Sequence, residues 1–207
     1  MELVQCIESN GTVWSTQGRH IQRREQGEQW QTFASFPWTG PRDIFSINRI
    51  GRRVARADMS SVFVTCCGLI LGIRAGVIFR VERNQLYVLG EINGDIPLAG
   101  GFCEDNQGQI YFGEYFLNPK QAPVRIWRIR PDLQNLEVAW EFPEKSVRHV
   151  HAVRLDPFDR GVIWVATGDD TNECYLWRTN DGFQTLERFG DGTQAWRAVN
   201  IYFTEKY

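Results

Sequence analysis

The sequence predicts an all-β fold made of four similar repeats, and three observations support this prediction. The 207 residues include eight Trp, thirteen Phe and nineteen Gly, a composition typical of aromatic strands separated by turns. A short apolar block that ends in arginine recurs about every 50 residues, at Arg23, Arg80, Arg128 and Arg178. No helical periodicity of comparable length competes with this pattern.

Each repeat contains four expected strands, taken here in chain order. The first strand of the four repeats is expected over residues 3–8, 53–59, 98–104 and 149–155. The second is expected over residues 13–14, 62–71, 110–112 and 163–165. The third contains the arginine block, over residues 21–23, 78–80, 126–128 and 176–178, and the fourth begins at Trp30, Leu86, Leu136 and Leu186.

A four-stranded antiparallel unit that recurs at roughly 40 to 50 residues is typical of a β-propeller blade. We expect one propeller domain over residues 1–207, with four blades over about 1–40, 50–93, 97–143 and 148–190. Residues 194–204 are expected to form the first strand of a fifth blade, so that the ring is partial and the remaining blades belong to a longer chain. A ring closed at four blades and a β-sandwich are the alternatives.

The fourth repeat contains a local motif, Thr179 to Leu186 (TNDGFQTL). It resembles the Asp-box, S/T-x-D-x-G-x-T-W, of BNR-repeat propellers such as sialidases, with Phe183 in place of Gly and Leu186 in place of Trp. Weaker copies occur at residues 24–30 and 130–136. In such a turn Asp accepts backbone N–H groups, Gly takes a positive φ and the last apolar residue packs into the blade. The motif therefore indicates structure rather than catalysis.

A longer resemblance covers residues 148–197, together with GEYFLNP at residues 113–119. These segments resemble BNR, sialidase-like propeller proteins of the WD40/YVTN/BNR-like superfamily. The resemblance implies an N-terminal part of a propeller with six or more blades, and carbohydrate or another small polar molecule as ligand.

Two long polar loops, between the second and third strands of repeats three and four, are expected on the same rim as the starts of the first strands. Arginine can clamp a carboxylate, and carboxylates can transfer protons or attack a sugar. A glycan site would use Glu114, Asp169 and Asp170 as catalytic acids. The expected ligand-binding residues are Arg52, Arg53, Tyr115, Asn118, Trp196 and Arg197.

The same rim also contains candidate metal ligands. His149 and His151 are two residues apart on an expected strand, so their side chains point to one face. Glu173, with Asp169 and Asp170, adds carboxylate oxygens. A mixed set of imidazoles and carboxylates suits a divalent transition metal better than calcium.

A ligand-binding or scaffold role is the favoured function class, and a glycan-active hydrolase is the alternative. The formal charge of -2 and the pI of about 6.0 do not favour nucleic acid or an anionic membrane as partner. No leader or membrane span is recognisable. The five cysteines match no paired zinc spacing, which favours reduced thiols and a cytoplasmic location.

Overall fold

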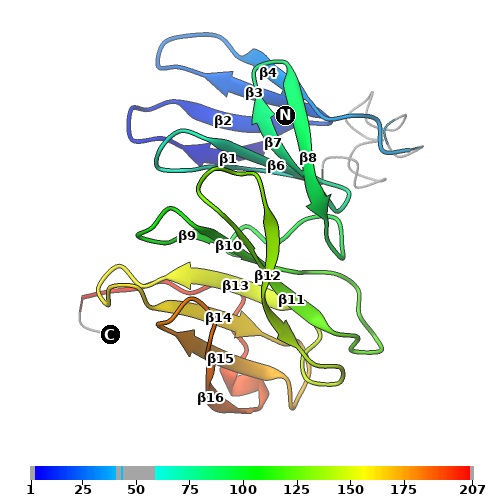
Figure 1. The fold of residues 1–207 in the computed structure, drawn as a ribbon, viewed down its shortest axis with the longest axis vertical. Helices are drawn as coiled ribbons and strands as arrows, with labels where there is room; N and C mark the ends of the chain where they lie inside the picture. Colours follow the sequence, from blue (N-terminus) through cyan, green and yellow to red (C-terminus); the bar gives the residue numbers. More distant parts are fainter. Residues whose placement is uncertain (1–2, 41–42, 44–58, 206–207) are drawn as a thin grey trace. The chain divides into compact units, whose positions relative to one another are not determined.

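The computed structural model describes residues 3–40, 43 and 59–205. Over these residues the protein is all-β, with sixteen strands in four antiparallel sheets of four strands each (Figure 1). The chain divides into two compact units, Met1–Ile96 and Pro97–Tyr207, and each contains two of the sheets. In every sheet each strand pairs with the next one along the chain, as in a propeller blade.

The sheets of the first unit are formed by eight strands. They are β1 (Leu3–Ile7), β2 (Val13–Gln17), β3 (His20–Arg24) and β4 (Gln31–Ser35), then β5 (Ser60–Val64), β6 (Ile70–Arg74), β7 (Val77–Glu82) and β8 (Gln85–Glu91). The core between these two sheets contains Trp14 and Ile21 from one sheet, and Val62 and Phe79 from the other.

The sheets of the second unit are formed by the other eight strands. They are β9 (Phe102–Glu104), β10 (Ile110–Gly113), β11 (Val124–Ile129) and β12 (Leu136–Phe142), then β13 (Val150–Leu155), β14 (Ile163–Thr167), β15 (Cys174–Thr179) and β16 (Glu187–Gly192). Their core contains Tyr111 and Phe142 from one sheet, and Val150, Val165 and Phe183 from the other. The strands are therefore close to those expected in three of the four repeats.

The second repeat differs from the prediction. Residues 53–58 lie outside the described residues. The first strand of this sheet is β5, which overlaps the start of the apolar run 62–71 that was expected to be the second strand. The run is divided by a turn in which the Thr65 Oγ1 accepts the N–H of Leu69 at 2.9 Å. Hydrophobic periodicity does not detect this turn, because apolar residues lie on both sides of it.

Residues 194–204 also differ from the prediction. The structure forms a short 3-10 helix, η2 (Gln194–Trp196), and no strand over the described residues that follow. This segment bonds to side chains of β13 instead of to a strand edge: Ala198 O lies 3.0 Å from His151 Nδ1, and Asn200 Oδ1 accepts a hydrogen bond from Arg154 Nε. A strand requires a backbone ladder with a neighbour, and the segment makes none.

The β15–β16 turn contains the TNDGFQTL motif. Asp181 Oδ1 accepts the N–H groups of Gln184 and Thr185, both at 3.0 Å, and its Oδ2 accepts the Thr185 hydroxyl at 2.6 Å. Phe183 has a φ of 70° and a ring centroid 5.2 Å from that of Tyr111. The side chain that packs most deeply is thus Phe183, which is buried, rather than the expected Leu186, which is only partly buried.

No helix in the described part of the chain is both long and apolar enough to cross a membrane.

Candidate metal centre

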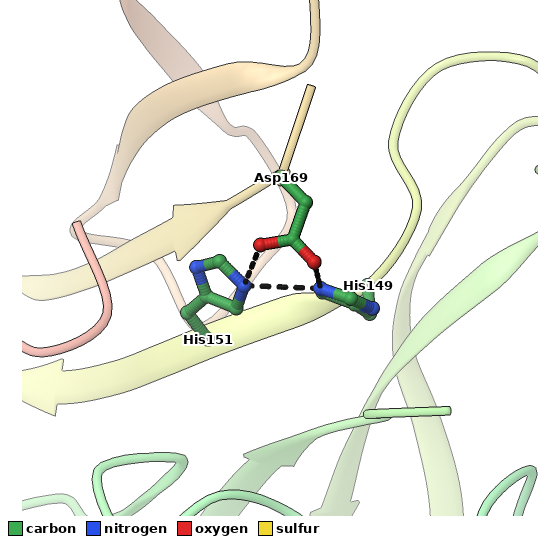
Figure 2. A group of neighbouring side chains, drawn as sticks. All are labelled: His149, His151 and Asp169. Atoms are coloured by element: carbon green, nitrogen blue, oxygen red, sulfur yellow. Dashed lines mark hydrogen bonds and ion pairs between the residues drawn. The ribbon is translucent and has the colours of Figure 1, made fainter. Parts of the chain in front are cut away.

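Two imidazoles and one carboxylate of the second unit converge, as Figure 2 shows. His149 precedes β13 and His151 lies in it, so the two side chains share a face. The two Nε2 atoms are 3.0 Å apart. Asp169, just after β14, places Oδ2 2.9 Å from His149 Nε2 and Oδ1 3.3 Å from His151 Nε2.

Two glycines allow this convergence. A Cβ on Gly113, at the end of β10, would lie 2.3 Å from Val150 Cγ1, so only glycine lets β10 approach the start of β13 this closely. Gly168 has a φ of +87° and begins the β14–β15 loop that carries Asp169; a Cβ there would lie 2.0 Å from Glu173 O. The backbone therefore brings the two loops and β13 together at the cluster.

Backbone carbonyls fix the tautomers of both histidines. His149 Nδ1 lies 3.3 Å from Phe116 O, and His151 Nδ1 lies 3.0 Å from Ala198 O. A carbonyl only accepts, so each Nδ1 carries a hydrogen and each neutral ring directs the lone pair of Nε2 into the cluster. Metal-binding histidines characteristically donate their second N–H in this way.

The spacing of the donor atoms suits a metal ion. Metal–nitrogen bonds of about 2.0–2.1 Å place neighbouring ligand atoms roughly 2.9 Å apart in an octahedron and roughly 3.4 Å apart in a tetrahedron. The closest approaches of the cluster, 2.9 to 3.3 Å, fall within this interval. Three electron-pair donors that face one another repel, and a cation between them removes this repulsion.

The protonation states also suit a metal. Burial lowers the pKa of His151, and this effect outweighs the opposite effects of the Ala198 carbonyl and of Asp169. Burial alone would raise the pKa of Asp169, but His149, His151 and Arg197 together bring it below its usual value. At neutral pH the cluster thus offers a carboxylate and a neutral imidazole at these two residues, the forms that bind metals.

Arg197 and Tyr115, both expected in the ligand site, lie beside the cluster. Arg197 Nη2 donates to Asp169 Oδ1 at 2.7 Å. The Tyr115 ring centroid lies 4.4 Å from that of His149 and 6.0 Å from that of His151. These two residues give the cluster a cationic neighbour and an aromatic one.

Glu173, expected to be a metal ligand, instead shapes the loop. Its side chain is buried; Oε1 accepts the N–H groups of Asp169 and Asp170, at 3.2 and 2.8 Å, and Oε2 accepts Gln121 Nε2 at 2.8 Å. These bonds occupy both oxygens, so the carboxylate positions Asp169 and lies outside the histidine cluster.

Two other expected site residues are also structural. Glu114 is fully buried, where Oε2 accepts the Arg125 N–H and Oε1 accepts Trp127 Nε1, so it holds β10 to β11 and cannot reach a substrate in this conformation. Asn118 is buried and bonds to Ala122 and to the carbonyl of Arg148. The side chains of Glu114 and Asn118 are hydrogen-bonded within the protein, and the sequence alone does not show these bonds.

The remaining expected residues are dispersed. Asp170 forms an exposed ion pair with Arg148. Trp196 lies over β16, where its ring fills the space beside Gly190. Arg52 and Arg53 lie outside the described residues.

Three contributors to the site were not predicted. Gln121 holds Glu173, and the carbonyls of Phe116 and Ala198 hold the histidines. Backbone carbonyls leave no mark in a sequence, and a single glutamine in a polar loop has no distinguishing pattern.

Comparisons with known proteins support the fold. No family model and no curated protein matches the chain. A solved structure described as "YCF48 bound to D1 peptide" is similar with a TM-score of 0.55 and 15% sequence identity, over 93% of this chain and 53% of that one. The chain thus spans about half of the YCF48 chain, and at this identity the likeness concerns the fold alone. Four antiparallel four-stranded sheets and this likeness together show a β-propeller fold.

Proposed function

We propose that this β-propeller chain is a binding module, and that its second unit holds a divalent transition metal between His149, His151 and Asp169. The observation that carries the proposal is the convergence of two imidazole Nε2 atoms and one carboxylate, with both Nδ1 atoms held by backbone carbonyls. This is the arrangement of first and second ligand shells found in metalloproteins.

The donor set favours particular metals. Two imidazoles and a carboxylate suit Zn²⁺, Fe²⁺ or Co²⁺, whereas Ca²⁺ and Mg²⁺ prefer oxygen ligands alone. Three protein ligands also leave at least one coordination position for an external molecule, unlike the closed sites of structural zinc. The site therefore supports ligand binding through the metal.

Binding is better supported than hydrolysis. A glycan hydrolase of the common type needs two carboxyl groups beside the sugar. Among the described candidates, Glu114 is buried in the sheet, Asp169 lies against the histidines and Asp170 pairs with Arg148. The peptide bound to YCF48 supports a protein or peptide as partner, and the Asp181 turn supports a kinship with BNR repeats.

Calorimetry on metal-stripped chain tests the proposal. Cys66 and Cys67, which are exposed, are first replaced by Ser so that their thiols cannot bind the metal. We expect one Zn²⁺ or Co²⁺ per chain. Loss of a ligand in His149→Ala or His151→Ala should weaken binding more than the roughly 10- to 100-fold typical of a second-shell change.

The matched control is His20→Ala. His20 is the one histidine of the chain outside the cluster. It bonds to Ser35 in the first unit, so its loss should leave the metal affinity unchanged. Absence of binding at one equivalent, or a loss in His20→Ala as large as in His151→Ala, would show that the cluster is structural.

A further inference from the structure

We propose that the metal at this site takes a carboxylate-bearing ligand, whose oxygens bridge the open coordination position and the guanidinium of Arg197. This inference rests on the metal binding proposed above. What is added to the metal binding is the chemical class of the ligand and the residue that selects this ligand.

Arg197 is placed for this role. Its Nη2 bonds to Asp169 Oδ1 at 2.7 Å, while the other oxygen, Oδ2, faces His149 Nε2. The Asp169 carboxylate therefore lies between the guanidinium and the metal position. Its side chain is 44% exposed, and a guanidinium carries five N–H donors in a planar fork, so the contact with Asp169 leaves donors for a second carboxylate.

The local charge favours a monoanion and makes its binding depend on the metal. Among the described residues, the charged side chains linked to the cluster are three carboxylates, Asp169, Asp170 and Glu173, and two guanidiniums, Arg148 and Arg197. With neutral histidines the site has a net charge of about −1, which becomes about +1 with a divalent ion. A carboxylate neutralises this charge, whereas a dianionic phosphate exceeds it and the metal-free site repels both.

Tyr115 favours an organic ligand over a bare inorganic anion. Its ring lies beside both histidines, with centroid distances of 4.4 and 6.0 Å. An aromatic face can contact the carbon skeleton that carries a carboxylate. A peptide C-terminus and a sugar acid both offer this combination.

Titration of the Co²⁺-loaded chain with small carboxylates tests the inference, because ligands that enter the cobalt shell change its visible absorption. The probes are acetate, N-acetylglycine as a peptide C-terminus and galacturonate as a sugar acid; N-acetylglycinamide and phosphate are the controls. We expect all three carboxylates to change the spectrum and the amide to leave it unchanged. At saturating Co²⁺, Arg197→Gln should weaken carboxylate binding about tenfold or more.

Arg178→Gln is the matched control, because Arg178 is also partly exposed and paired with one carboxylate, Asp159, at 3.0 Å. It should leave carboxylate binding unchanged. Tighter binding of N-acetylglycine than of galacturonate identifies a peptide source, and the reverse identifies a sugar acid; both support the inference.

Three results would overturn it while leaving the metal site intact. They are cobalt binding with no response to carboxylates, equal carboxylate affinity in the metal-free chain, and tighter binding of phosphate than of any carboxylate. Failure of cobalt itself to bind would overturn the metal site and this inference together.

Discussion

At the scale of single residues, Phe183 and Leu133 occupy backbone positions that glycine usually takes. Their φ angles are 70° and 50°, and both side chains are buried. A non-glycine residue in this region costs about 1 kcal/mol or more. Burial of a large apolar side chain contributes roughly 1.5–3 kcal/mol, so packing outweighs the backbone strain in both turns.

At position 183 the glycine variant should therefore be more stable than the alanine variant, the reverse of the usual order. Phe183→Ala removes the contact with Tyr111 and keeps the strain, and we expect it to cost about 3 kcal/mol or more. Phe183→Gly loses the same contact but relieves the strain, so it should be about 1 kcal/mol more stable than the alanine variant. Urea unfolding of the three proteins measures both differences.

Phe112 is the control, because it is fully buried in β10 and has no positive φ. There the glycine variant should be less stable than the alanine variant, by roughly 0.5–1 kcal/mol. If glycine is also the worse substitution at position 183, the backbone there is not strained.

Individual residues of the metal centre were predictable to different degrees. The shared face of His149 and His151 follows from the two-residue period of a strand. Asp169 was recognised as a rim carboxylate, both as a catalytic acid and as one of three carboxylates that could bind the metal, and Glu173 was placed among the metal ligands. What separates the two is the direction of each carboxylate within a short loop: Glu173 turns toward backbone N–H groups and Asp169 toward the histidines. Sequence spacing does not contain this information.

At the scale of elements, the repeated strands were predictable because the strands of each blade bury apolar side chains in a similar pattern. In β11, for example, Val124 and Ile126 are buried while Arg125 and Trp127 between them are only partly buried. The positions of turns were less predictable. The turn at Thr65 lies inside an apolar run, and the segment after Gly192 has strand-like residues but no ladder.

The β15–β16 turn should make stability depend on pH. The hydroxyl and N–H of Thr185, with Thr179 and Gln184, lower the pKa of Asp181 to about 2, against about 3.9 in an unfolded chain. Because the folded value is the lower one, the contribution of the carboxylate is complete above about pH 5 and is lost as the pH falls through about 4 toward 2. The stability difference between the natural chain and Asp181→Asn should therefore shrink over this interval.

Urea midpoints of both proteins between pH 2 and 7 measure this effect. Between pH 5 and 7 the two curves should run parallel, since Asp181 stays ionised in both the folded and unfolded states there. A difference that stays constant down to pH 2 would mean that the turn does not depend on the charge of Asp181.

At the scale of the whole molecule, the chain consists of two units with separate hydrophobic cores. The metal centre belongs entirely to the second unit, since all its ligands and supporting residues lie between positions 113 and 198. A metal ion bound there stabilises the part of the chain that unfolds with it. A metal at 100 times its Kd adds about 2.7 kcal/mol to that part.

Two cysteines report on the two units separately. Cys103 is buried in the second unit, and burial raises the pKa of its thiol, so it reacts with alkylating reagents only after unfolding. Cys6 in the first unit is partly buried, and burial together with Glu8 raises the pKa of its thiol too. In the chain with Ser at positions 66 and 67, pulse alkylation in increasing urea followed by mass spectrometry gives an unfolding midpoint for each thiol.

We expect saturating Zn²⁺ to raise the urea midpoint of Cys103 and to leave that of Cys6 unchanged, because each unit buries its own core. In His151→Ala the metal should move neither midpoint, which excludes general effects of zinc on the reagent. If the metal raises both midpoints equally, the two units unfold as one cooperative body and the propeller segment is stabilised as a whole. If zinc raises neither midpoint in the chain that keeps His149, His151 and Asp169, the cluster does not bind the metal in the folded state.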